Sequence, residues 1–129
     1  MQKPKVIVIG GPTAVGKTKL SIELAKQING EIISADSMQI YKEMDIGTAK
    51  PTVEEMQGIK HHLLDFVKPN ERYSVADFRI DAMKCIEEIL LKGKVPIVIG
   101  GTGLYIDTLI YNIKYPEIEI DLEIGRAHV

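Results

Sequence analysis

Eight residues of the types that bind phosphate follow a short apolar segment, residues 6–9, and precede a helical pattern. They fit the spacing G-x-x-x-x-G-K-[ST], in which glycines let successive backbone N–H groups turn toward a phosphate. The lysine adds a mobile positive charge, and the final hydroxyl is available to Mg²⁺. A tight turn alone would need a glycine but not the Gly-Lys-Thr ending. The sequence therefore predicts a di- or triphosphate site formed by Gly11, Pro12, Thr13, Ala14, Val15, Gly16, Lys17 and Thr18.

A carboxylate and a second glycine-rich run follow two further apolar segments. Asp36 comes just after residues 31–34, and Gly-Gly-Thr-Gly comes directly after residues 95–99. Asp36 has the chemistry of a general base toward an incoming nucleophile, or of a Mg²⁺ ligand, directly or through water. An aspartate that caps a local turn with Ser37 fits the same residues. From the residues alone, both interpretations of Asp36 stay open.

Strand and helix patterns alternate along the chain. Short β-branched runs predict strands at residues 6–9, 31–34 and 95–99, with a weaker one at 61–65. Helical spacing predicts helices at residues 17–27, from an N-cap at Ser74 to Gly93, and at 104–111. Strand–loop–helix units in series give a parallel sheet with helices on both faces. We therefore expect a P-loop NTPase-like α/β fold that is incomplete at the carboxyl end.

The predicted topology gathers the candidate residues on one rim. Loops after parallel strands emerge at the carboxyl edge of the sheet, where open α/β folds place their ligands. The phosphate loop, the segment after Asp36 and the Gly-Gly-Thr-Gly run therefore share that edge. The strand at residues 95–99 is followed by Gly-Gly and not by the acidic Mg²⁺ ligand that γ-phosphoryl chemistry usually requires. This weakens the interpretation as a motor or switch ATPase.

Composition predicts one cytoplasmic domain. The chain has 129 residues and a formal net charge of −2, so it has no global field that attracts nucleic acid. No signal-peptide pattern or membrane-spanning apolar run occurs, and the single cysteine, Cys85, excludes an internal disulfide. Residues 123–129 have no apolar periodicity and resemble a translated sequencing adapter. We expect a partial α/β core at residues 1–122 and a non-native or disordered tail at 123–129.

Six blocks together resemble the amino-terminal part of the tRNA dimethylallyltransferase family. Their order and spacing match that family, and the likeness extends over nearly everything from Val6 to Ile110. The middle two blocks are far more specific than the phosphate loop. The blocks are residues 11–18, 31–41, 44–51, 61–65, 73–78 and 100–105.

The resemblance implies transfer of a dimethylallyl group from dimethylallyl diphosphate to N6 of the adenosine 3′ of the tRNA anticodon. The phosphate loop would then bind the diphosphate leaving group, although such a loop is conventionally labelled ATP-binding. Lys17 and a Mg²⁺ near Thr18 would stabilise its growing charge. Thr13 would lie near the allylic oxygen, and Asp36 would accept the amine proton. Contacts with the anticodon stem-loop are implied for Asp36, Ser37, Met38, Gln39 and Thr102.

Several expectations about the rest of the protein accompany this resemblance. The family continues with a helical insertion that grips the anticodon stem-loop, and the 129 residues lack it, so we expect an inactive, monomeric fragment. Two rival enzymes would use the same loop: an isopentenyltransferase acting on free adenine nucleotide, and a small-molecule P-loop kinase. A non-catalytic nucleotide-binding module is the rival from another class. It predicts that replacing Asp36 with Asn leaves function intact.

Overall fold

Five strands and four helices are present in the computed structural model, which describes residues 5–10, 15–36, 51–64, 66–68, 70–100, 103–114 and 121–126. In chain order they are β1 (Lys5–Gly10), α1 (Val15–Ile28), β2 (Gly30–Ser34), α2 (Val53–Met56), β3 (His61–His62), α3 (Val75–Leu91), β4 (Val95–Ile99), α4 (Leu104–Lys114) and β5 (Asp121–Arg126). The four predicted strands and three predicted helices are confirmed, with boundaries that differ by a few residues.

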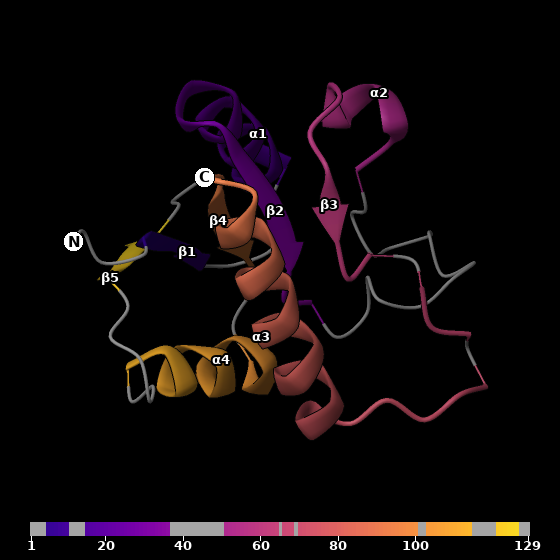
Figure 1. Ribbon diagram of the computed structural model, residues 1–129. Helices are drawn as coiled ribbons and strands as arrows, with labels where there is room; N and C mark the ends of the chain where they lie inside the picture. The colour runs from indigo at the N-terminus through magenta and orange to yellow at the C-terminus, as the bar shows by residue number, and fades with distance from the viewer. Residues whose placement is uncertain are drawn as a thin grey trace.

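The strands form one parallel sheet in the order β3-β2-β4-β1-β5 (Figure 1). Every pair of neighbouring strands runs in the same direction. In the register, Ile99 at the end of β4 pairs with both Ile9 of β1 and Ser34 of β2. The carboxyl ends of the three central strands therefore lie level with one another, and the loops that follow them start from one edge.

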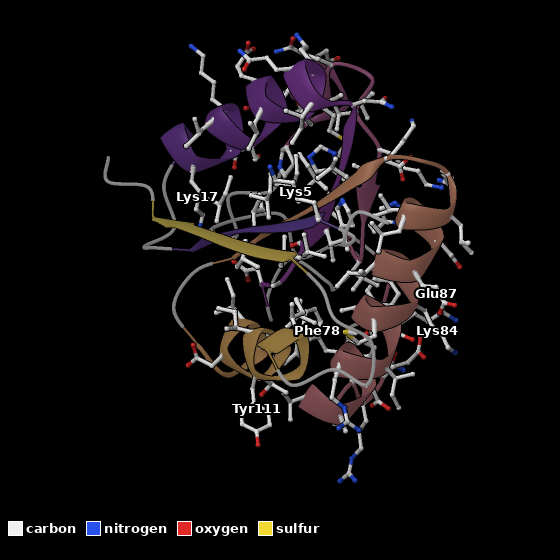
Figure 2. All side chains as sticks on the ribbon, turned by 60° about the vertical axis from the view of Figure 1, so that its left-hand side comes forward. Lys5, Lys17, Phe78, Lys84, Glu87 and Tyr111 are labelled. Atoms are coloured by element: carbon white, nitrogen blue, oxygen red, sulfur yellow. The ribbon has the colours of Figure 1, made fainter. Side chains whose placement is uncertain are left out.

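The three central strands, β1, β2 and β4, are buried on both faces, as strands of a parallel sheet with helices on each side must be. Successive side chains of a strand point to opposite faces, so alternate residues of β1, β2 and β4 enter two separate cores. One core packs against α1 and contains Ile7, Ile9, Ile32, Ile97 and Ile99. The other packs against α3 and α4 and contains Val6, Val8, Ile33, Ala35 and Val98. Figure 2 shows α1 on one side of the sheet and α3 with α4 on the other.

Local capping signals account for two helix starts, one predicted and one missed. The Ser74 side chain accepts from the Asp77 backbone N–H, and the Asp77 carboxylate accepts from that of Ser74, which confirms the predicted capping box of α3. The same reciprocal pair, Thr52 with Glu55, begins the single-turn helix α2. The spacing of Thr52 and Glu55 could have indicated α2 from the sequence.

The carboxyl-terminal segment differs from the expected tail. Strand β5 pairs in parallel with β1 from Lys5 opposite Asp121 to Gly10 opposite Arg126. Residues 123–126 are therefore in a strand, which corrects the expectation of disorder for that part of the segment. A partner strand supplies the order that the weak local pattern does not. The non-native origin of the segment stays a prediction. Among the described residues, no helix is long and apolar enough to cross a membrane.

Candidate functional site

The carboxyl edge of the sheet brings together two of the predicted site residues that the structure describes. Lys17 lies in the first turn of α1, and Asp36 follows the end of β2 by two residues. Thr18 neighbours Lys17 in the same turn. Three strand ends therefore contribute to one rim: β1 through the loop to α1, β2 through Asp36, and β4 through Gly100.

Lys17 is a buried cation. It is 4% exposed, and it lies on the side of α1 that faces the sheet (Figure 2). Burial lowers the pKa of Lys17 below its ordinary value, because an ammonium loses hydration there, while the charge of Asp36 acts in the opposite direction. The two side chains are thus close enough to interact electrostatically. A cation buried at a strand–helix junction is suited to an anionic ligand.

Thr18 is half-buried beside this cation. Its backbone carbonyl accepts a hydrogen bond of 2.7 Å from the Ser21 hydroxyl within the first turns of α1. The Thr18 hydroxyl and the Asp36 carboxylate are hard oxygen donors, the kind that Mg²⁺ prefers. Mg²⁺ usually keeps several waters and is bound through few protein groups plus phosphate oxygens. The chemistry of these residues therefore fits a Mg²⁺–diphosphate ligand.

Asp36 is half-buried, and the backbone before it is fixed by the neighbouring strand. The Ala35 N–H donates to the Ile99 carbonyl at 2.7 Å, and the Gly100 N–H donates to the Ile9 carbonyl at 3.2 Å. These two bonds continue the ladder past the last strand residues and join the ends of β2, β4 and β1. The backbone that carries the Asp36 carboxylate is therefore held rigidly. Precise positioning of this kind is what a group that reacts with a substrate requires.

The remaining predicted site residues lie outside the described part of the chain. They belong to the phosphate loop, the segment after Asp36 and the loop after β4, and the roles predicted for them stay predictions. They are Gly11, Pro12, Thr13, Ala14, Ser37, Met38, Gln39 and Thr102. The backbone of Val15 and Gly16 begins α1, so the last part of the predicted phosphate loop is helical.

An aromatic cluster next to the third loop was missed by the sequence analysis as a unit. Tyr105, in the first turn of α4, stacks on Phe78 with ring centroids 4.6 Å apart. Its hydroxyl donates to the Tyr73 carbonyl at 3.2 Å, and the Tyr73 ring packs edge-on against Phe66. The residues come from three segments that only the fold brings together. Tyr105 therefore acts as a packing aromatic between α3 and α4.

A buried ion network lies at the opposite, amino edge of the sheet. The Glu31 carboxylate is 3% exposed and accepts from His62 Nε2 at 2.7 Å. The ammonium groups of Lys92 and Lys94 lie 3.2 Å and 3.3 Å from its two oxygens. Burial alone would raise the pKa of Glu31, but the hydrogen bonds from His62, Lys92 and Lys94 outweigh it and lower that pKa to about 2. The network joins β2, β3 and the segment before β4.

Acid should weaken the fold through this carboxylate. The pKa of Glu31 falls from 4.5 to about 2 on folding, so the stabilisation is present above pH 4.5 and is lost as pH falls toward 2. The loss is on the order of 3 kcal/mol in the free energy of unfolding. Urea unfolding between pH 6 and pH 2 measures it, with Glu31→Gln as the comparison. Parallel pH profiles of the parent chain and the variant would contradict the prediction.

The rings of His61 and His62 lie on opposite faces of β3 and have different partners. His61 pairs with Ile32 and His62 with Ile33, so the two side chains are on opposite faces of β3. His61 Nδ1 donates to the Ile59 carbonyl at 2.9 Å, and burial lowers the pKa of His61, which favours the neutral ring. Within the described residues, no group of three or more His, Cys, Asp or Glu side chains is arranged to bind a metal ion.

Comparison with known proteins adds family relationships to this geometry. The sequence matches a family model described as IPP transferase over residues 39–127. It is 66% identical over 121 residues to a tRNA dimethylallyltransferase of Acetivibrio thermocellus and 57% identical over 126 residues to one of Staphylococcus haemolyticus. These matches cover 94% and 98% of this chain but 39% and 38% of the relatives. The chain thus spans less than half the length of these curated relatives.

The solved structures that resemble this chain have names of the same kind as the sequence relatives. The full-length tRNA isopentenylpyrophosphate transferase of Bacillus halodurans matches with a TM-score of 0.81 at 54% identity, over 92% of this chain and 39% of that one. A eukaryotic dimethylallyltransferase acting on tRNA matches with a TM-score of 0.78 at 49% identity, over 82% of this chain and 26% of that one. The predicted fold class is therefore confirmed.

Proposed function

This chain belongs to the IPP transferase family, and on that premise we propose that it binds the diphosphate of a prenyl donor and accepts the proton in a tRNA prenyl transfer. The reaction moves a dimethylallyl group from dimethylallyl diphosphate to N6 of the adenosine on the 3′ side of the anticodon and releases diphosphate. The observation that carries the proposal is the placement of buried Lys17 and half-buried Asp36 at the same carboxyl edge of the sheet. The Lys17 ammonium is suited to bind an anion, and the Asp36 carboxylate is suited to accept a proton.

The donor end of the site consists of the phosphate loop and the start of α1. The Lys17 ammonium would bind the diphosphate. As the allylic C–O bond breaks, negative charge grows on this leaving group, so its attraction to the ammonium becomes stronger. Thr13 would approach the allylic oxygen. Thr18 would hold Mg²⁺, which when bound supplies further stabilisation of the diphosphate charge. No water needs activating in such a reaction, in agreement with a β4 that is followed by Gly100 and not by a carboxylate.

Asp36 would act on the other substrate. The exocyclic amine of adenine is a weak nucleophile, and removal of its proton as the C–N bond forms lowers the barrier. The carboxylate accepts that proton, and diphosphate leaves with the electron pair of the broken C–O bond. Ser37, Met38, Gln39 and Thr102 would contact the tRNA around a flipped-out adenosine, since a stacked base would not reach a closed pocket. We propose a monomeric protein of the cytoplasm.

A transfer assay tests the proposal. The full natural reading frame that encodes this chain is incubated with Mg²⁺, dimethylallyl diphosphate and an anticodon stem-loop RNA, and the nucleosides are analysed by mass spectrometry. We expect N6-dimethylallyladenosine at the position 3′ of the anticodon, and little product from the 129 residues alone. An RNA with guanosine at that position is the matched control. Modification of free adenine nucleotide but not of the RNA, or phosphoryl transfer from ATP, would overturn the proposal in favour of the rival enzymes.

A further inference from the structure

We infer that Gly100 is a positioning residue for the proposed proton acceptor: the hydrogen atom in place of its side chain lets the chain leaving β2 pass directly against β4. This fixes the peptide from which Asp36 projects. The inference rests on the proposed function of Asp36 and adds a residue to it that does not touch substrate.

The contact between the two segments leaves no room for a methyl group. A Cβ placed on Gly100 would lie 2.8 Å from the Ala35 carbonyl oxygen, 3.0 Å from Ala35 Cβ and 3.2 Å from the Ala35 carbonyl carbon. Two of these three atoms are backbone, so no side-chain rotation relieves the clash. The Gly100 backbone is not in the left-handed region. Glycine is therefore needed at this position for space and not for backbone freedom.

A displaced Ala35 has few directions in which to move. Its side chain is 4% exposed and packs in the core under α3 and α4, and its N–H donates to the Ile99 carbonyl at 2.7 Å. Gly100 is itself held by its bond to the Ile9 carbonyl. The hydrogen bonds to Ile99 and Ile9 and the packing of the Ala35 side chain in the core thus restrain both Ala35 and Gly100. The peptide that joins Ala35 to half-buried Asp36 must absorb the shift, and the carboxylate moves with it.

Gly30 supplies a matched control on the same two strands. A Cβ on Gly30 would lie 2.7 Å from Ile97 Cδ1 and 3.0 Å from the Val95 carbonyl oxygen, so Gly30→Ala is also crowded. Gly30 pairs with Val95 at the amino end of β2 and β4, whereas Gly100 follows the carboxyl end. Both substitutions should lower thermal stability, but only Gly100→Ala disturbs the segment that holds Asp36.

The experiment compares Gly100→Ala with Gly30→Ala in the full natural reading frame. Thermal unfolding, the affinity for inorganic diphosphate with Mg²⁺, and kcat and KM for prenyl transfer are measured. We expect Gly100→Ala to lower kcat about 100-fold, the effect of a misplacement near 1 Å. Its KM for dimethylallyl diphosphate should stay near the parent value, and Gly30→Ala should keep both constants. Equal loss of kcat in the two variants would overturn the inference, because it would reveal a general structural effect.

A double-mutant cycle with Asp36→Asn separates this inference from the proposed function. If Gly100 acts through Asp36, Gly100→Ala costs little further activity once the carboxylate is absent. A full additional loss in the Asp36→Asn background would overturn the positioning role. Normal turnover of Asp36→Asn itself would instead overturn the proposed base. Should Gly100→Ala unfold more readily than Gly30→Ala, both variants are assayed below their unfolding temperatures, where an equal loss of kcat in the two folded proteins would again contradict the inference.

Discussion

Replacing Asp36 with Asn should abolish most prenyl transfer while the protein still binds diphosphate. The amide keeps the size of the side chain but does not accept the amine proton, and general bases contribute about 10²- to 10⁴-fold to rate. Single-turnover measurement with saturating dimethylallyl diphosphate and stem-loop RNA gives the loss in the chemical step. Calorimetric titration with inorganic diphosphate and Mg²⁺ shows whether the donor site is kept. The expected pattern is a fall in kcat with little change in diphosphate affinity.

Asp81→Asn is the matched control for this experiment. Asp81 is also half-buried, and its carboxylate accepts a hydrogen bond of 2.6 Å from the Tyr73 hydroxyl, which an Asn oxygen still accepts. It lies on α3, outside the rim formed by the strand ends. Its replacement should leave kcat unchanged. Unaltered turnover in Asp36→Asn would contradict the proposed base and favour a non-catalytic nucleotide-binding module.

Replacing Lys17 with Met should weaken diphosphate binding without weakening the fold. Loss of a charged hydrogen bond to an anion lowers affinity about 10- to 100-fold. The folded protein holds this ammonium at a cost, as the lowered pKa of Lys17 indicates, and Met fills similar space without that cost. Thermal unfolding without ligand should therefore occur at an equal or higher temperature. The stabilisation that inorganic diphosphate provides should largely disappear.

Lys19→Met controls for the removal of one positive charge from α1. Lys19 is exposed and lies two residues further along the same helix. Its replacement should change neither diphosphate affinity nor ligand-induced stabilisation. If Lys17→Met and Lys19→Met bound diphosphate equally well, the Lys17 ammonium would not be part of the anion site. A large drop in the unfolding temperature of Lys17→Met would instead show that Lys17 stabilises the fold.

Local patterns in the sequence were sufficient for most of the elements. The capping box of Ser74 and Asp77, the β-branched run of β4 and the Gly-Lys-Thr ending before α1 each act within a few residues, so a single sequence carries them. Their order along the chain then predicts a parallel sheet and places the phosphate loop and Asp36 on one edge. The match to an IPP transferase agrees with that topology.

Only the tertiary structure decided which distant residues meet. Glu31 is 31 residues from His62 and 61 from Lys92, and no periodicity predicts that both residues bond to its carboxylate. Gly100 belongs to a glycine-rich run in the sequence, and only the fold brings it against Ala35. Strand β5 forms because β1 offers a free edge, although its own residues have little local preference. Each of these contacts depends on how strands are ordered in space, and a pattern of neighbouring residues does not encode that order by itself.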